Sequence, residues 1–234
     1  MNLPLSSLRS TNPNMTNRSP VTKQYDDGML WVNAMDKETV CKNANAIMDR
    51  LTYANSSINI FKSILDFYEK DDPELLLPDL NFWIAVADNC CFRSLTELAK
   101  SYDEDQEAVG LRRLMNQAEQ TKSAGIKAIL QLARENYDKL APPREKLKTL
   151  RDKGLAHSDK KYATNLQSLI SAYGLSLEEQ LALINTAADI CNDILAEFTG
   201  VGRSVALAHN DDARGILEDV RIAREVREKQ KFFG

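Results

Sequence analysis

Histidine, cysteine and the short motifs of common enzyme classes are scarce in this sequence. Its 234 residues include two histidines and four cysteines. The adjacent pair Cys90 and Cys91 fits neither a CxxC redox motif nor the usual spacing of zinc ligands. Phosphate-binding loops, dinucleotide-binding glycine motifs, the serine-hydrolase elbow and the zinc-protease pattern are also missing. These absences predict a protein that needs no metal or cofactor and keeps its thiols reduced, as in the cytoplasm.

Long apolar runs are missing as well. No stretch approaches the roughly eighteen apolar residues that span a bilayer, and the N-terminus lacks the basic-then-apolar order of a signal peptide. We therefore expect a cytoplasmic protein that does not associate with membranes. The net charge of −4 and the pI of about 5.4 exclude a protein that coats nucleic acid with its whole surface. Any polyanion must bind a local patch.

The apolar residues follow a helical period, and no segment has the alternation of a β-strand. A strict 4-3-4-3 spacing runs from Val40 to Tyr68, and a second runs from Leu177 to Phe198. Such stripes predict an all-α antiparallel helical bundle. From them we expect five residues to be buried: Leu51, Ile58, Phe61, Ile184 and Leu195.

Three regions are expected along the chain. Residues 1–33 are rich in Ser, Thr, Asn and Pro and predict a flexible N-terminal arm. Residues 34–200 form the bundle, in which a capping box over residues 176–179 starts one helix. Residues 201–234 contain a charged amphipathic helix from about Asp212 to Lys231, which we interpret as an appendage or a partner-binding arm.

The most informative segment is LRDKGLAHSDKK at residues 150–161, because it combines an arginine and a histidine in a basic helix that opens with Pro142 and Pro143. The window 144–161 has seven basic and three acidic residues, within a chain of negative net charge. The His157 imidazole can transfer protons near neutral pH. The Arg151 guanidinium can bind the same phosphate through two hydrogen bonds. Together they suit phosphodiester cleavage without a metal.

Six residues of an ideal α-helix rotate by about 600°, so Arg151 and His157 lie about 120° apart. They do not share a face of one helix. Either their side chains reach across a groove, or two copies of the chain form a composite site. The second geometry predicts a two-fold symmetric homodimer.

The motif, its helical setting and the upstream segment AKSYDED resemble the HEPN superfamily, within it the abortive-infection AbiU-like branch. The family signature is an arginine followed after four to six residues by a histidine, which Arg151 and His157 match. The resemblance implies a dimeric helical bundle with metal-independent endoribonuclease activity in phage defence or toxin–antitoxin systems. It also implies RNA and an antitoxin or defence protein as partners. Some family members keep only a binding or structural role.

One position departs from the family pattern. The residue after the arginine is commonly asparagine and is Asp152 here, and its carboxylate either repels RNA or orients Arg151 or His157. We therefore group Arg151, His157 and Asp152 as the candidate catalytic residues. The candidate RNA-binding residues are Lys153, Lys160, Lys161 and Tyr162.

Other candidates are weaker. The carboxylates at 103–107 suggest either a magnesium site or, by default, an acidic first turn of a helix that faces solvent. Phe82 and Trp83 fit the core or an interface better than a base-stacking role. His209 fits an exposed linker. The sequence thus predicts an RNA-cleaving effector, with a non-catalytic module that binds RNA, nucleotide or protein as the alternative.

Overall fold

The computed structural model describes residues 36–71, 76, 79–105, 107–155, 174–205 and 212–233. The chain divides after Asn33, and all the described residues belong to the unit 34–234. Within these ranges the secondary structure is helical and no strand occurs, which confirms the prediction of an all-α bundle. The elements are α1 (Lys37–Asp66), η1 (Phe67–Asp71), α3 (Leu80–Ser101), α4 (Leu111–Gln120), α5 (Ile126–Lys139), α6 (Ala141–Leu150), η3 (Arg151–Leu155), α8 (Leu177–Thr199) and α9 (Asp212–Phe233).

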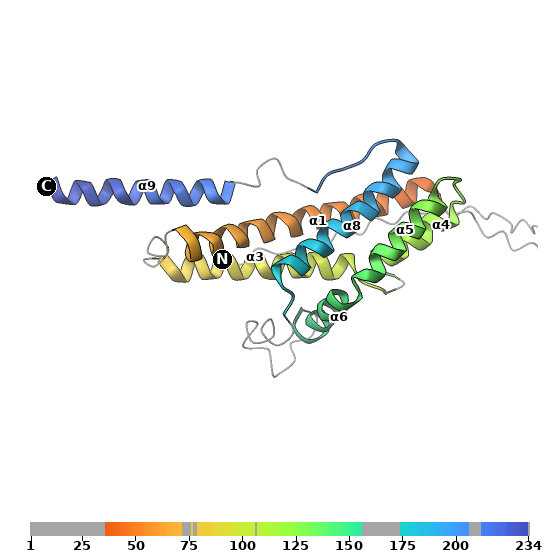
Figure 1. Ribbon diagram of the computed structural model, residues 1–234, viewed down its shortest axis with the longest axis horizontal. Helices are drawn as coiled ribbons and strands as arrows, with labels where there is room; N and C mark the ends of the chain where they lie inside the picture. The colour runs from red at the N-terminus through yellow and green to blue at the C-terminus, as the bar shows by residue number, and fades with distance from the viewer. Residues whose placement is uncertain are drawn as a thin grey trace, which may run out of the picture. The chain divides into compact units, whose positions relative to one another are not determined.

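Helices α1, α3 and α8 form the centre of the bundle. They lie side by side, and α1 runs antiparallel to the other two (Figure 1). Burying an apolar stripe against a neighbouring helix is the main source of helix stability in a folded protein. The core cluster joins these three helices with α4, α5 and α6.

The stripe on α1 faces this core over most of its length. Asp36 caps the helix by accepting a hydrogen bond from the Glu38 backbone N–H at 3.2 Å. The stripe residues are buried as far as Ile58, whereas Phe61 is only partly buried, so its predicted burial is wrong. Ile64 and Phe67 are buried instead, in a second cluster that includes Trp83 and Leu217. The end of α1 therefore turns a different face inward, toward the start of α3 and toward α9.

The helix α8 begins and ends as its sequence predicts. The Ser176 hydroxyl accepts a hydrogen bond from the Glu179 N–H at 3.1 Å, and the Glu179 carboxylate accepts one from the Ser176 N–H at 2.9 Å. Gly200 ends the helix with φ at +72°, a left-handed conformation that favours glycine. Ile184 and Leu195 are buried as expected.

The chain around Pro142 and Pro143 positions the residues of the candidate site. Helix α5 ends at Lys139, and α6 starts at Ala141 with prolines in its first turn, where a missing backbone N–H is tolerated. Leu147 and Leu150 of α6 are buried in the core. The opposite side of α6 is thereby left for polar side chains. No described helix is long and apolar enough to cross a membrane.

Candidate functional site

A pocket of about 490 Å³ lies between the end of α3, the loop that follows it, and one side of α6 and η3. This volume is within the range of small-molecule and nucleotide sites. Ala99 and Leu147 supply part of its apolar lining, and the remaining lining is largely charged. Arg151 and Asp152, two of the predicted catalytic residues, both line it.

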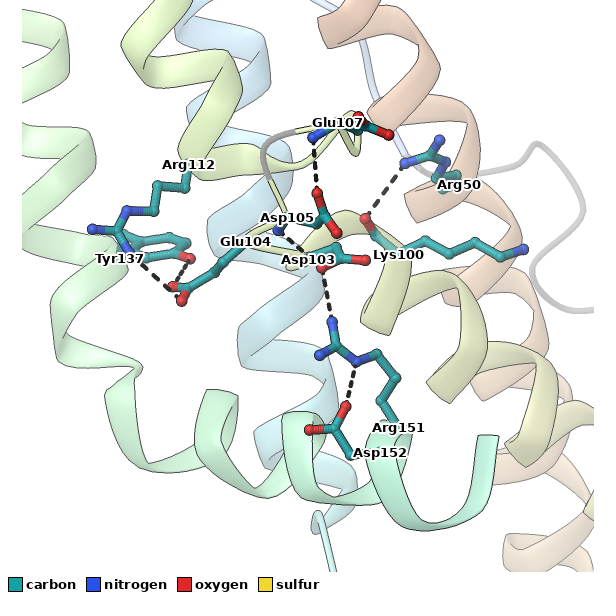
Figure 2. A network of polar contacts seen from close by, with 10 residues as sticks. All are labelled: Arg50, Lys100, Asp103, Glu104, Asp105, Glu107, Arg112, Tyr137, Arg151 and Asp152. Carbon is teal, nitrogen blue, oxygen red and sulfur yellow. Dashed lines mark hydrogen bonds and ion pairs between the residues drawn. The ribbon is translucent and has the colours of Figure 1, made fainter. Parts of the chain in front are cut away.

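Arg151 is held between two carboxylates. Its Nη1 donates a hydrogen bond to Asp103 Oδ1 at 2.8 Å, and its Nε donates one to Asp152 Oδ1 at 2.8 Å (Figure 2). Burial acts to lower the pKa of Arg151, but the hydrogen bonds and charges of Asp152 and Asp103 outweigh burial and raise it. The guanidinium is therefore permanently charged and fixed in direction. The Asp152 carboxylate thus contacts Arg151 directly.

Asp103 is positioned by its own loop. Its Oδ1 accepts a hydrogen bond from the Asp105 N–H at 3.1 Å, and Asp105 Oδ1 accepts one from the Glu107 N–H at 2.9 Å. These are turns in which a side chain mimics backbone hydrogen bonding. The carboxylates thus belong to a loop, and α4 begins only at Leu111. The expectation of an acidic first helical turn is wrong, because the aspartates bond to their own backbone instead of continuing a helix.

Two contacts anchor this loop to the bundle. Arg50 of α1 donates a hydrogen bond from Nη1 to the Val109 carbonyl at 2.7 Å and a longer one to the Lys100 carbonyl at 3.5 Å. Gly110 packs so closely that a Cβ added to it would lie 2.1 Å from the carbonyl oxygen of Asp103. The position of Asp103 therefore depends on the absence of a side chain at Gly110.

Glu104 connects the same loop to α4, α5 and α6. It accepts hydrogen bonds from Tyr137 Oη at 3.2 Å and from Arg144 Nη1 at 3.3 Å, and it lies 3.5 Å from Arg112 Nη1. The Arg144 guanidinium lies over the Tyr137 ring, 3.7 Å from its centroid. Figure 2 shows Glu104 beside Asp103, directed toward Tyr137, while Asp103 is directed toward Arg151. Adjacent carboxylates of one loop thus hold two arginines of the pocket.

Two tyrosines inside the bundle support the loop of Asp103 and Glu104. Tyr102 and Tyr137 stack with their ring centroids 5.9 Å apart, and the buried Tyr102 hydroxyl donates a hydrogen bond to the Leu183 carbonyl at 2.7 Å. Burial raises the pKa of Tyr102 well above its usual value. Burial also raises the pKa of Tyr137, although the charge of Arg144 opposes it. Both phenols stay neutral and act as structural groups.

The structure places only part of the predicted site. Lys153 lies in η3 and is half-buried. The other predicted residues, His157, Lys160, Lys161 and Tyr162, lie outside the described residues. Residues 151–155 form a π-helical turn, so the rotation of 100° per residue behind the 120° estimate does not apply there. Turns of this kind frequently occur at functional sites.

The weaker candidates have separate outcomes. No group of three or more metal-ligating side chains comes together within the described ranges, and Asp103 and Glu104 are engaged by arginines. Trp83 is buried in the second cluster, whereas Phe82 is 61% exposed. His209 lies outside the described part of the chain.

The sequence did not identify Asp103, Glu104, Arg144, Arg50 and Gly110 as parts of the site. The one signal for them was charge, because the acidic segment 103–107 complements the basic window 144–161. That signal gives no register, since it does not say which carboxylate meets which arginine.

The fold is the helical bundle that the resemblance to the HEPN class implies, and the motif arginine lies in a pocket of it. The chain belongs to the HEPN family AbiU2, whose family model matches residues 49–218. The matched range contains the acidic loop, α6 and the whole motif from Arg151 to His157. The resemblance seen in the sequence is therefore confirmed. Neither the curated proteins nor the solved structures include a significant match.

Proposed function

We propose that this protein is a metal-independent endoribonuclease that acts as an effector in phage defence or in a toxin–antitoxin system. The observation that carries the proposal is the fixed guanidinium of Arg151, which lies at a pocket of nucleotide size and belongs to the family motif. A preorganised cation of this kind stabilises charge that develops in a transition state. Abortive infection is the setting that the family implies.

In the proposed reaction the 2′-oxygen of a ribose attacks the adjacent phosphorus, and the bond from phosphorus to the 5′-oxygen of the next nucleotide breaks. His157 accepts the proton of the 2′-hydroxyl or delivers one to the leaving 5′-oxygen, and a water molecule makes the other proton transfer. Arg151 stabilises the charge on the phosphorane. Asp103 and Asp152 are positioning residues, because they act through the guanidinium that they hold. The product is a 2′,3′-cyclic phosphate.

A symmetric homodimer is also part of the proposal. It rests on family membership, because the π-helical turn removes the angular argument for a composite site. In a dimer, two motifs would face one RNA strand across the symmetry axis. Light scattering at micromolar concentration tests this point, and a monomer that cleaves RNA at the full rate would overturn it.

A non-catalytic module that binds RNA, nucleotide or a protein partner is the second candidate, and one observation favours it. The described lining of the pocket has three cations and five carboxylates, and among these ligands this negative balance favours a protein partner over RNA. In addition, Arg151 already donates hydrogen bonds from Nε to Asp152 and from Nη1 to Asp103. A binding module requires no free catalytic arginine.

Cleavage of RNA by the purified chain, freed of any bound inhibitor, separates the two candidates. His157→Ala should abolish cleavage and keep most of the affinity, since phosphate binding rests on the cations, whereas Arg151→Ala should impair both. Asp152→Asn should change the rate, because Asp152 contacts Arg151. Activity should persist in EDTA. Wild-type protein that cuts no RNA, or a His157→Ala variant that cuts normally, would leave the binding module as the function.

A further inference from the structure

A groove of about 560 Å³ lies between α5 and the C-terminal half of α8. Its apolar floor is formed by Ala128, Ile129 and Leu132 of α5 and by Ala196 of α8. None of these residues lines the pocket of Arg151. Leu132 is 53% exposed, and both alanines are exposed as well. Sites for small molecules bury most of their ligand, so a floor that is open to this extent suits a macromolecular partner better.

The floor has the form that receives an α-helix. The start of α5 lies at the end of α8, because Ser123, just before α5, donates a hydrogen bond from its hydroxyl to Glu197 at 2.8 Å. The two helices pack against each other, and the small side chains at 128 and 196 leave room between them for the side chains of a third helix. No strand occurs among the described elements, so they offer no sheet edge to an extended peptide.

The α8 edge of the groove is acidic. Asp189, Asp193 and Glu197 follow the spacing i, i+4, i+8, which places them in one row along the helix with a rise of about 6 Å per step. Asp193 and Glu197 line the groove, and its described lining contains no lysine or arginine. Within the described ranges, Asp189 and Asp193 have no hydrogen-bonding or ion-pair partner. This row of carboxylates therefore lacks a counter-charge.

The carboxylates of the row differ in how they are held. Burial raises the pKa of Asp193, and the negative charge of Asp189 adds to this effect. A cation bound beside them would offset that repulsion. Glu197 is fixed by its hydrogen bond from Ser123, and a Cβ at Gly125 would collide with its carboxylate. One end of the row is thus preorganised, and the middle is left without a partner.

We infer that this groove binds a basic amphipathic α-helix of a protein partner. The inference goes beyond the proposed function, because it concerns a surface that shares no lining residue with the motif pocket. Apolar side chains of the partner, at i, i+4 and i+7, cover Leu132 and the alanines. Its lysines or arginines, four residues apart, pair with the row on α8, because both helices have the same rise per residue. The carboxylates favour this occupant over RNA or an anionic lipid surface.

Binding of a designed peptide to the full chain tests the groove. The probe is a fluorescein-labelled helix of about fifteen residues, with leucines at i, i+4 and i+7, lysines on both sides of the leucines and alanine elsewhere. A second peptide has glutamate in place of every lysine. Fluorescence anisotropy should show binding of the lysine peptide. The glutamate peptide should bind about tenfold more weakly or less, because it loses several ion pairs and gains like-charge contacts.

Two variants and two matched controls locate the binding site. Leu132→Ala should weaken binding about tenfold, because it removes apolar area from the floor, whereas Ile222→Ala, at a residue of α9 that is 54% exposed, should not change it. Asp193→Asn should weaken binding about two- to fivefold. Asp138→Asn removes the same charge from an exposed, unpaired aspartate of α5 that does not line the groove, and should have little effect.

Each outcome decides the inference. Binding of the lysine peptide that depends on Leu132 and Asp193, but not on their controls, supports it. Equal losses for Asp193→Asn and Asp138→Asn would show an effect of net charge and would overturn it. Equal affinity of the two peptides, no binding, or full affinity of Leu132→Ala would do the same. Light scattering tests another occupant: a dimer that Leu132→Ala converts to a monomer would assign the groove to a second copy of the chain and overturn the protein partner.

Discussion

Gly110→Ala is the most informative single substitution outside the motif. The backbone of Gly110 has φ at −116°, which alanine adopts without strain, so the effect of the new methyl group is purely steric. That methyl carbon would lie 2.1 Å from the Asp103 carbonyl oxygen, whereas real Cβ atoms keep at least 3.0 Å. The Asp103 backbone must therefore move by about 1 Å. Overpacking of this size costs about 1–3 kcal/mol of unfolding free energy.

The same movement displaces the carboxylate that orients Arg151. A misplacement of about 1 Å can cost about 100-fold in rate, so we expect RNA cleavage by Gly110→Ala to fall by a factor of that order. Single-turnover cleavage and urea unfolding measure the two effects. In an Asp103→Asn background, Gly110→Ala should reduce the rate little further, because both changes act through one contact.

Gly215→Ala is the matched control, because a Cβ there meets nothing within 4 Å. It lies inside α9, where alanine is favoured over glycine, so unfolding free energy should rise by up to about 1 kcal/mol and cleavage should not change. Wild-type cleavage by a folded Gly110→Ala protein would refute the role of the 103–110 loop in positioning Arg151.

Two further predictions concern buried groups. Tyr102→Phe should lower the unfolding free energy by about 1–2 kcal/mol in urea titrations, because the bond to the Leu183 carbonyl is lost, whereas Tyr53→Phe, 53% exposed, should have little effect. Burial, with smaller contributions from Asp88 and Cys90, raises the pKa of Cys91 to about 11. The unfolded thiol loses its proton first, so the contribution of Cys91 to stability is constant below about pH 8.5 and falls by about 2–3 kcal/mol as the pH rises to about 11. Cys91→Ala should flatten this decline, and an unchanged slope would contradict the assignment.

Local patterns predicted the helices well, because each depends on residues close in sequence. The stripe from Val40 to Ile58 and the capping box at Ser176 specify their helices without reference to the rest of the chain. Phe61 was mispredicted because the end of α1 meets a second cluster, and a periodic stripe does not say which neighbour it faces. The partner of a helix face is a tertiary property.

The site was predicted only in part for the same reason. Arg151 was identified from its motif, but its bond to Asp103 joins residues 48 positions apart, and sequence spacing does not encode such a pair. The π-helical turn at 151–155 also has no signature in the sequence, and it changes the angle assumed between motif residues. The carboxylates of 103–107 were predicted to begin a helix, but they form turns. Aspartate favours both helix N-termini and turns, so the residue type alone does not distinguish the two.

The bond from Arg50 to the loop has a consequence for how the protein is made. Arg50 is 59 positions from Val109 of the loop, and Asp103 is 48 positions from Arg151. These residues meet through the packing of α1, α3 and η3. A ribosome adds residues in order, at about 5–20 per second, so a nascent chain that has reached α5 contains the anchored loop but not the arginine that it holds. The pocket is therefore completed late in synthesis. A truncated product that ends before α6 lacks Arg144 and Arg151, the arginines that pair with Glu104 and Asp103 in the complete protein.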